Sequence, residues 1–230
     1  MPERAERLDM ATSIRRQPGR PKDLAKREAI IQSARLLFGR KTFTAVTMDA
    51  VAQDAGVSKM TLYSHFGDKE ALFEAVVKSV SASAIEAGAE VKDGTGLDLK
   101  DHLIAIGVAF LTPLLDPDIA GLGHVVAAAL DKNADLARRF YHAGPVQTRD
   151  MLAEVIEAAS RRNELLVNDP VQAAEDLTAL WRGELANRLI FGMVHSITEQ
   201  EIRAQIDHGT DIFLRAYGKQ PPARIRLRSI

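Results

Sequence analysis

Residues 47–69 read TMDAVAQDAGVSKMTLYSHFGDK, which is the pattern of two short helices separated by a tight turn. Thr47 is placed to cap the first helix, whose apolar side consists of Met48, Val51, Ala52 and Ala55. Gly56 follows where a helix ends in the left-handed conformation, which glycine adopts without steric cost. A second helix begins almost at once, with Ser58 as its cap.

The second helix has an apolar inner side and a polar outer side. Val57, Leu62 and Phe66 point inward, and the outer side carries Lys59, Met60, Thr61, Tyr63 and His65. Two helices arranged in this way form a helix-turn-helix, in which the second helix enters the DNA major groove and reads base edges. The outer residues are therefore predicted to face DNA. The spacing by itself also fits an ordinary helical hairpin, so both interpretations stay open at this level.

Neighbouring residues favour DNA binding. The segment from Thr47 to Phe73 resembles the DNA-binding segment of tetracycline-repressor-like (TetR family) regulators. The matching positions are Thr47, Val51-Ala52, Ala55-Gly56-Val57-Ser58, Thr61-Leu62-Tyr63, His65-Phe66 and Lys69-Glu70-Ala71-Leu72. The sequence departs from the family at Met60, where a small residue such as glycine is common, so no base preference is transferred at that position.

The resemblance implies a set of DNA contacts. Tyr63 and Lys69 correspond to positions that contact backbone phosphates. Lys59 and Met60 project toward base edges, where lysine donates to guanine and methionine touches a thymine methyl. The complete predicted set is Arg20, Lys22, Thr47, Ser58, Lys59, Met60, Thr61, Tyr63, His65 and Lys69.

Arg20 and Lys22 belong to a basic segment at the start of the chain. Residues 1–22 are polar, lack periodicity and contain the run RRQPGRPK at positions 15–22, so we expect a disordered arm. Its Gly-Arg-Pro core is similar to the minor-groove element of AT-hooks, and such an arm can enter a narrow A·T-rich minor groove. A solvated tail without a DNA role is the alternative.

Charge and composition bound the protein class. Residues 10–69 contain 11 Lys or Arg and 5 Asp or Glu, whereas residues 71–230 contain 17 and 22, so a basic front section precedes an acidic body. This charge asymmetry is typical of a protein that contacts DNA phosphates with one end only. The chain has no cysteine, which excludes disulfides and thiolate metal sites. No apolar run approaches the roughly 18–20 residues of a membrane span, and no signal peptide is recognisable, so we expect a cytoplasmic protein.

The sequence predicts an all-α fold in which an N-terminal three-helix helix-turn-helix head is joined by a long helix to a helical ligand-binding and dimerisation body. We expect the head at residues 23–69, with a first helix over 23–38 that ends at Gly39. The body is expected at residues 70–218, and a disordered tail at 219–230. Asp68 is placed to cap the long helix, which should extend to about Val91 and be the only mechanical link between head and body.

The body shows helical patterns and no alternating strand pattern. Residues 136–145 and 169–184 resemble the AefR-like C-terminal domain found in part of the same family, which implies an effector pocket. Because residues 97–167 are rich in alanine, leucine and valine, we expect a small apolar or aromatic effector. Side chains that would line the pocket, each of which also fits an ordinary core or surface role, are Phe110, His124, Phe140, Met151, Trp181 and Arg182.

Two body helices are predicted to form a homodimer interface. The helix expected over residues 170–194 carries apolar side chains on nearly every face, which one chain can hardly cover. The helix expected over residues 198–217 contains Gly209, which permits close approach of another helix. We expect both to pair with their symmetry mates in a four-helix arrangement. The alternative is that they are internal core.

A search for catalytic chemistry finds no candidate. The histidines show no pair at metal-ligand spacing, and Gly121-Leu122-Gly123 lacks the third glycine of a dinucleotide fingerprint. We therefore predict no metal, no cofactor and no enzymatic activity. The favoured function is a ligand-responsive transcriptional regulator, a repressor that binds a palindromic double-stranded DNA operator as a homodimer and is released by a small molecule. An architectural DNA-binding protein without an effector is the alternative, and an enzyme with a DNA-binding head is a third class.

Overall fold

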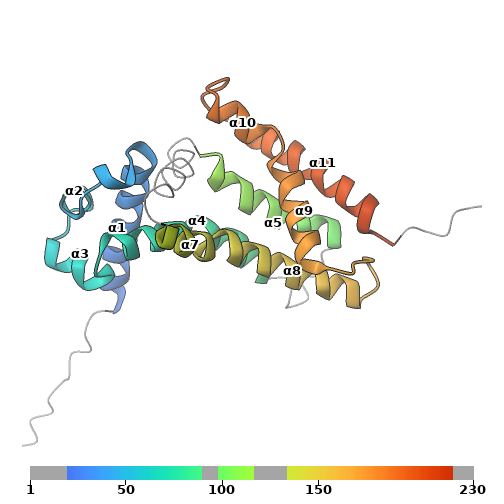
Figure 1. The fold of residues 1–230 in the computed structure, drawn as a ribbon, viewed down its shortest axis with the longest axis horizontal. Helices are drawn as coiled ribbons and strands as arrows, with labels where there is room; N and C mark the ends of the chain where they lie inside the picture. The colour runs from blue at the N-terminus through green and yellow to red at the C-terminus, as the bar shows by residue number, and fades with distance from the viewer. Residues whose placement is uncertain (1–19, 90–97, 117–133, 220–230) are drawn as a thin grey trace, which may run out of the picture.

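The computed structural model describes residues 20–89, 98–116 and 134–219, which form helices and no sheet (Figure 1). This confirms the predicted all-α fold. The head contains α1, η1, α2 and α3, with bounds Arg20–Arg40, Phe43–Ala45, Met48–Asp54 and Lys59–Phe66. The remaining helices are α4 Lys69–Ala89, α5 Leu99–Leu114, α7 Ala134–Ala143, α8 Pro145–Arg161, α9 Pro170–Arg182, α10 Leu185–Ile190 and α11 Glu199–Tyr217.

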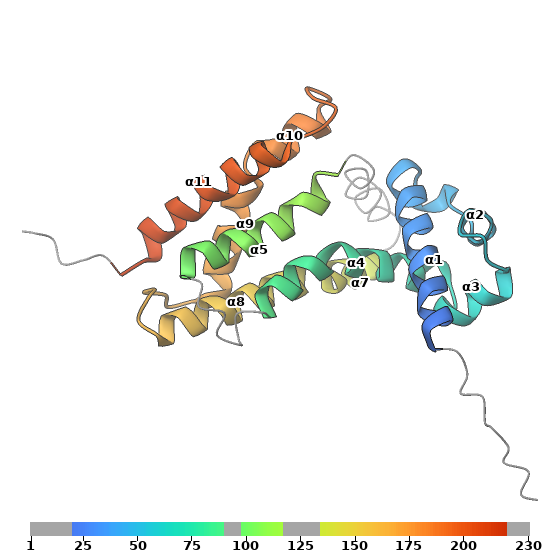
Figure 2. The same cartoon turned by 180° about the vertical axis from the view of Figure 1, so that it is seen from behind.

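The head lies at one end of an elongated molecule, and α4 leads from it into the body (Figures 1 and 2). Helix α7 runs beside α4 in both views and packs against it. Helices α5, α8, α9 and α11 form the body around a separate apolar core. The recognition helix α3 is therefore at the far end of the molecule from α9 and α11.

Local capping explains the helix-turn-helix. The Thr47 hydroxyl accepts a hydrogen bond from the Ala50 amide at 3.2 Å, and the Ser58 hydroxyl accepts one from the Thr61 amide at 3.1 Å. Gly56 joins the helices with φ of 64°, the left-handed conformation that its position predicted. The Asp68 carboxylate then accepts from the Ala71 amide at 2.7 Å and starts α4. All these caps agree with the sequence prediction.

Three predicted boundaries are wrong. Helix α1 begins at Arg20, so the expected disordered arm does not extend to residue 22, because Pro21 is compatible with a first helical turn. Helix α1 also continues through Gly39 to Arg40, since packing of the buried Phe38 outweighs the weak helix preference of glycine. Residues 1–19 of the arm lie outside the described residues. Lys219, which was expected to start the disordered tail, is held in place because its amide donates to the Glu164 carbonyl at 3.2 Å. Residues 220–230 lie outside the described residues.

The helix predicted over residues 170–194 is interrupted. Helix α9 ends at Gly183, which has φ of 45°, and a second turn follows α10 at Gly192, which has φ of 66°. A Cβ atom at Gly183 would lie 2.4 Å from the Gln205 amide nitrogen, so a larger residue would displace the Gln205 side chain in addition to straining the backbone. Helix α11 begins with the capping box of Thr198 and Glu201, as predicted.

An aromatic cluster joins the head to two other helices. Phe73 of α4 lies 4.6 Å from Phe38 and 5.5 Å from Phe43, measured between ring centroids. Phe140 of α7 lies 4.2 Å from Phe73 and 6.2 Å from Phe43. Helix α7 therefore contributes to the core of the head.

The head has a further contact with the body. Arg35 of α1 pairs with Asp116, just after α5, at 3.1 Å. The expectation that the long helix is the only link between head and body is therefore wrong, because α7 and the end of α5 both contact the head as well.

The body core is built around Trp181. Its indole nitrogen donates to the Thr210 hydroxyl of α11 at 3.0 Å, and both residues are fully buried. A Cβ atom at Gly209 would lie 3.0 Å from the Leu180 backbone, so the helix that Gly209 admits is α9 of the same chain. Much of the apolar surface assigned to a dimer interface is thus internal core, because α9 and α11 bury Leu177, Trp181, Ile202, Ile206 and Phe213 within one chain.

We predict that Phe140→Ala lowers the free energy of unfolding by about 3–5 kcal/mol, because it opens a cavity between head, α4 and α7. Urea denaturation followed by far-UV circular dichroism measures this change. Tyr141→Ala is the matched control, since the adjacent tyrosine is 54% exposed and should change stability by less than about 1 kcal/mol. Equal effects of the two variants would contradict the packing role of Phe140.

Candidate nucleic-acid interface

The outer face of α3 is open to solvent. Met60 is 83% exposed and Tyr63 is 48% exposed, whereas Leu62 and Phe66 are buried against the head. Leu62 and Phe66 therefore lie inside and Lys59, Met60 and Tyr63 outside, as the sequence predicted, whereas Thr61 and His65 are half-buried. A helix that presents its long side chains in this way can place them in a major groove.

Some predicted contact residues already have partners within the head. The Lys59 ammonium pairs with the Asp49 carboxylate of α2 at 2.6 Å, so it must leave this exposed pair to reach a base. The hydroxyls of Ser58 and Thr61 lie 2.8 Å apart and share a hydrogen bond. Ser58 and Thr47 both cap helices, and capping is the role that the structure shows for them.

Lys69 has a structural role that the sequence did not reveal. Its ammonium donates to the backbone carbonyls of Phe43 at 2.9 Å and Val46 at 3.1 Å, and it lies 4.5 Å from the Phe43 ring centroid. Lys69 therefore ties the start of α4 to the loop that precedes α2. An ammonium has three N–H donors, so a phosphate contact remains compatible with this geometry and stays a prediction.

The remaining predicted DNA-contact residues differ in accessibility. His65 is half-buried, with its ring centroid 6.1 Å from that of Phe66. Arg27 of α1 was not among the predicted contacts, and its guanidinium lies 5.3 Å from the Phe66 centroid. Arg20 and Lys22 belong to the first turns of α1, and their side chains lie outside the described set.

The predicted effector-contact residues separate into two regions. Phe110 and Trp181 lie together in the body core, with ring centroids 6.1 Å apart, and the Arg182 guanidinium lies 5.6 Å from the Phe110 centroid. Phe140 belongs to the aromatic cluster of the head and lies in a different core from Phe110 and Trp181, so its role as an effector contact stays a prediction. Met151 is half-buried on α8 and contacts Gly88 of α4, and His124 lies outside the described residues.

A groove of about 730 Å³ runs between α4 and α7. Glu74 on its wall accepts from Lys78 at 2.8 Å and from Arg139 at 3.2 Å. The hydrogen bond from Lys78, together with Arg139, lowers the pKa of the Glu74 carboxyl. Glu74 is therefore shared between two cations, and Glu86, Arg138 and His142 also line the groove.

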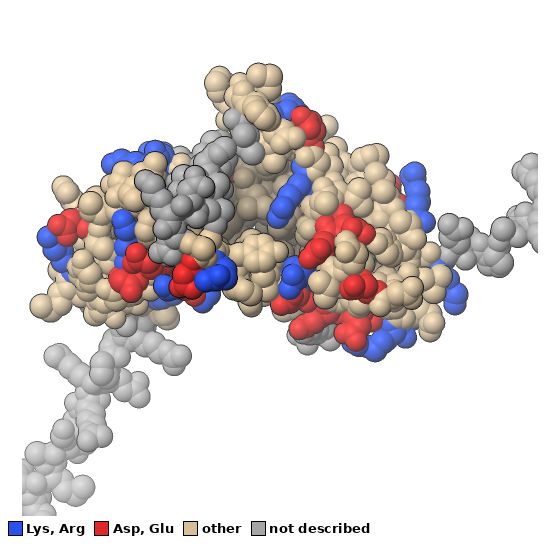
Figure 3. Space-filling view, in the orientation of Figure 1, with Lys and Arg blue, Asp and Glu red and all other residues tan. Residues whose placement is uncertain are grey.

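The body surface shown in Figure 3 gathers Asp and Glu side chains over α8 and α9. These helices carry accessible carboxylates at Asp150, Glu154, Glu157, Glu175 and Asp176. Such a surface repels phosphate, so the body is a poor DNA surface by comparison with the head. Within the described ranges, no cluster of three or more His, Asp or Glu could hold a metal ion, and no helix is long and apolar enough to cross a bilayer.

Sequence families match both parts of this architecture. Residues 30–76 match the N-terminal model of bacterial regulatory proteins of the tetR family, and residues 101–219, more than half of the chain, match the C-terminal domain of AefR-like transcriptional repressors. The chain belongs to the tetR family. It is therefore a helix-turn-helix transcriptional regulator, as the resemblance of residues 47–73 implied.

Individual relatives support this assignment. The HTH-type transcriptional repressor BdcR of Escherichia coli (strain K12) is 40% identical over 62 residues, which are 27% of this chain and 31% of BdcR. The chain thus spans about a third of that curated relative. A TetR-family regulator from Mesorhizobium loti MAFF303099 superimposes with a TM-score of 0.70 at 26% identity, covering 86% of this chain and 99% of that one. The flavonoid-responsive regulator FrrA superimposes with a TM-score of 0.60 at 31% identity, covering 85% and 98%.

We predict that Lys69→Met lowers the free energy of unfolding by about 1–3 kcal/mol, because the carbonyls of Phe43 and Val46 lose their charged donor. Chemical denaturation of the purified variants provides the measurement. Lys78→Met, which removes an exposed i,i+4 pair on the same helix, should cost less than about 0.5 kcal/mol. If Lys69→Met is as stable as Lys78→Met, the hydrogen bonds of Lys69 do not stabilise the head.

Proposed function

We propose that this regulator is a repressor that binds a palindromic operator as a homodimer and releases it when a small aromatic molecule enters the body. It would act in the cytoplasm, on chromosomal DNA. One combination of features supports the proposal: the outer face of α3 is exposed, and parts of the body contact the head directly. The first feature suits DNA binding, and the second suits its control.

The DNA-binding part of the proposal rests on the accessible residues of the head. Met60 and Tyr63 are the exposed large apolar or aromatic side chains of α3, Lys59 is exposed beside them, and Thr61 is half-buried. Two such helices, held about 34–36 Å apart, would fit successive major grooves of one operator. Lys69 would add a phosphate contact through the N–H that the carbonyls of Phe43 and Val46 do not use.

Release by a ligand requires a physical connection from body to head. Phe140 of α7 packs on Phe73 and Phe43, and Asp116 after α5 pairs with Arg35 of α1. A ligand that favours another arrangement of α5 and α7 would therefore change the orientation of the head. Its effect on DNA affinity equals its differential affinity for the two arrangements.

An aromatic effector fits the body and one relative. Phe110 and Trp181 supply adjacent aromatic rings from α5 and α9. FrrA, which is similar over most of its length, is named as flavonoid-responsive. We extend this chemistry to the present chain and propose a planar aromatic effector of flavonoid size.

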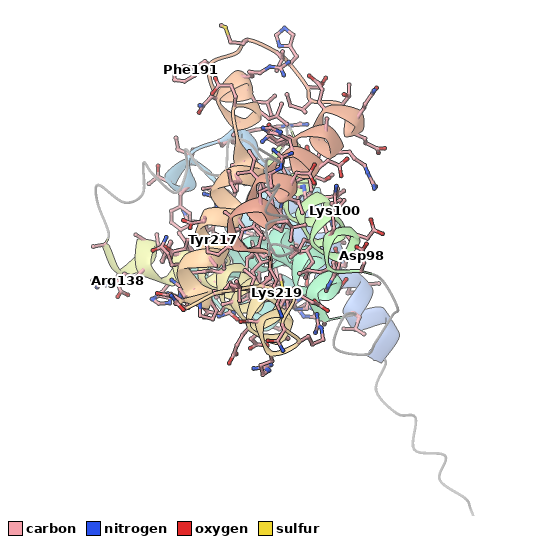
Figure 4. All side chains as sticks on the ribbon, turned by 90° about the vertical axis from the view of Figure 1, so that its right-hand side faces the viewer. Asp98, Lys100, Arg138, Phe191, Tyr217 and Lys219 are labelled. Carbon is pink, nitrogen blue, oxygen red and sulfur yellow. The ribbon has the colours of Figure 1, made fainter. Side chains whose placement is uncertain are left out.

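The homodimer interface is proposed around α10 and the outer sides of α9 and α11. Phe191 and Met193 are 73% and 71% exposed, although both are large and apolar. They lie in the turn after α10, and Figure 4 shows Phe191 on the periphery, directed away from the body. Covering these side chains with a second copy would remove apolar surface from water.

Footprinting on DNA that flanks the coding sequence tests the proposal. We expect protection of one inverted repeat, weak binding to a shuffled sequence, and release by flavonoids such as naringenin or quercetin. Similar affinity for specific and shuffled DNA would instead support an architectural role. Specific binding that no aromatic compound changes would refute the effector while keeping the DNA-binding part.

We predict that Tyr63→Ala weakens operator binding by about 1–3 kcal/mol with the fold intact, because a contact to the DNA backbone is lost. Fluorescence anisotropy with a labelled operator gives the affinity, and circular dichroism checks the fold. Tyr141→Ala removes an equally exposed tyrosine from the body and should leave operator affinity unchanged in the absence of effector. Equal affinity of both variants would show that α3 does not dock as proposed.

We predict that Phe191→Glu combined with Met193→Glu shifts the protein from dimer to monomer, because charges replace the exposed apolar side chains. Light scattering after size-exclusion chromatography, at several concentrations, measures the mass. Leu166→Glu changes another exposed apolar residue, outside the proposed interface, and should leave the mass of the dimer unchanged. A double variant that remains dimeric would place the interface elsewhere.

A further inference from the structure

Arg182 is a cation without a carboxylate partner. It is the last residue of α9, and among the described residues no Asp or Glu lies within ion-pair distance of its guanidinium. Nearby arginines behave differently, since Arg149 pairs with Asp150 at 2.8 Å and Arg188 pairs with Glu201 at 3.1 Å. An arginine keeps its charge in proteins, so this positive charge has no compensating partner in the described part of the chain.

The guanidinium of Arg182 lies at a junction of several helices. It sits 5.6 Å from the Phe110 ring centroid of α5, and that ring lies 6.1 Å from the ring of Trp181. Tyr141 on α7 acts on Arg182 through a charge interaction that raises the pKa of Arg182, and no hydrogen bond of the Tyr141 hydroxyl to another described residue is present. The cation, the phenol and the apolar ring come from three different helices, as the groups of a binding site do.

The surroundings of Arg182 combine solvent access with desolvation. The residue is exposed, yet desolvation by the surrounding protein lowers the pKa of Arg182, an effect that Tyr141 opposes. Figure 3 shows the body hollowed below α10, the helix that follows Arg182 in the chain.

This chemistry selects an anion attached to an aromatic ring. A guanidinium presents a planar set of N–H donors that match a carboxylate, and charge-assisted hydrogen bonds of this type are strong. The low polarity of a partly enclosed site strengthens them further. An uncharged aromatic molecule would leave the Arg182 donors unused, and a cationic one would be repelled.

We propose that Arg182 and Tyr141 bind an acidic group, either a carboxylate or an ionised phenol, of the aromatic effector. This inference rests on the proposed effector function and names the charge of its ligand. Arg182 provides the charged donors, Tyr141 provides a neutral O–H donor, and Phe110 supports the guanidinium from its apolar side. A helix C-terminus also favours a cation through the helix dipole, so the experiment must separate ligand binding from helix stabilisation.

Trp181 offers a direct measurement, because it is the single tryptophan of the chain and adjoins Arg182. Quenching of its fluorescence is followed during titration of the full-length protein with naphthalene-2-carboxylate and flavone-6-carboxylate, each compared with its neutral carboxamide. We expect at least one acid to bind about tenfold more tightly than its amide, the effect of a hydrogen bond to a charged group. Equal affinities for acid and amide, or quenching by neither compound, would overturn the proposal.

Substitutions show which residues cause the preference for the acid over the amide. Arg182→Gln should abolish the discrimination between acid and amide, and Arg182→Lys should restore part of it, because lysine keeps the charge without the planar donors. Tyr141→Phe should weaken acid binding and leave amide binding unchanged. Arg188→Gln, which removes a nearby paired arginine, should keep the full preference. A preference that survives in Arg182→Gln would refute the role of Arg182, and thermal unfolding identifies any variant that has lost its fold.

Operator binding, measured in parallel, separates this inference from the proposed function. Release of the operator by acids and amides alike would leave the proposed function intact and refute the charge preference. Acid binding that depends on Arg182 but never changes operator affinity would establish the site and refute the coupling.

Discussion

The contact of Phe140 with Phe43 and Phe73 is the interaction on which this architecture depends. The three rings belong to α7, the head and α4, and the short centroid distances leave no room for independent movement of these parts. Protein interiors are packed as densely as organic crystals, so a shift of one ring forces the others to repack. The head is consequently a continuation of the helical body through α7.

Other links between head and body differ in strength. The Arg35–Asp116 pair is partly exposed, with side-chain exposures of 24% and 37%, and such pairs contribute at most about 1 kcal/mol. Lys69 is a stronger link, since its charge is used by two carbonyls that would otherwise lack this donor. The packing of Phe140 therefore holds α7 to the head, and the hydrogen bonds of Lys69 hold the start of α4 to it. The ion pair is a weaker link between the head and the end of α5.

The sequence predicts those features that are set by near neighbours in the chain. The caps at Thr47, Ser58, Asp68 and Thr198 and the turn at Gly56 are local, and the structure contains all of them. The division of α3 into a buried and an exposed side follows from helical periodicity and is equally predictable.

Features that depend on distant residues were not predictable from periodicity. Lys69 finds its acceptors 26 and 23 residues away, and Arg182 finds its aromatic partner on another helix. The apolar faces of α9 and α11 were assigned to a dimer interface because periodicity shows that an apolar surface must be covered but does not show what covers it. In the structure, helices α5, α8, α9 and α11 of one chain cover much of this surface. Phe140 was assigned to the body pocket by resemblance to the family, and its place in the aromatic cluster of the head depends on residues that are distant in the sequence.

Helix α7 offers a route from a body ligand to the DNA-binding surface. Tyr141 and Phe140 are consecutive, so their side chains leave the helix about 100° apart, which follows from 3.6 residues per turn. One lies near Arg182, and the other enters the aromatic cluster of the head. A ligand that draws Tyr141 toward Arg182 would rotate or displace α7 and move Phe140 away from its place against Phe43 and Phe73. To reverse an occupancy of 99:1 it must supply about 5.5 kcal/mol of differential affinity. The packing of Phe140, at about 3–5 kcal/mol, is of similar size, so partial loss of this contact would account for a large share of the cost of the proposed switching.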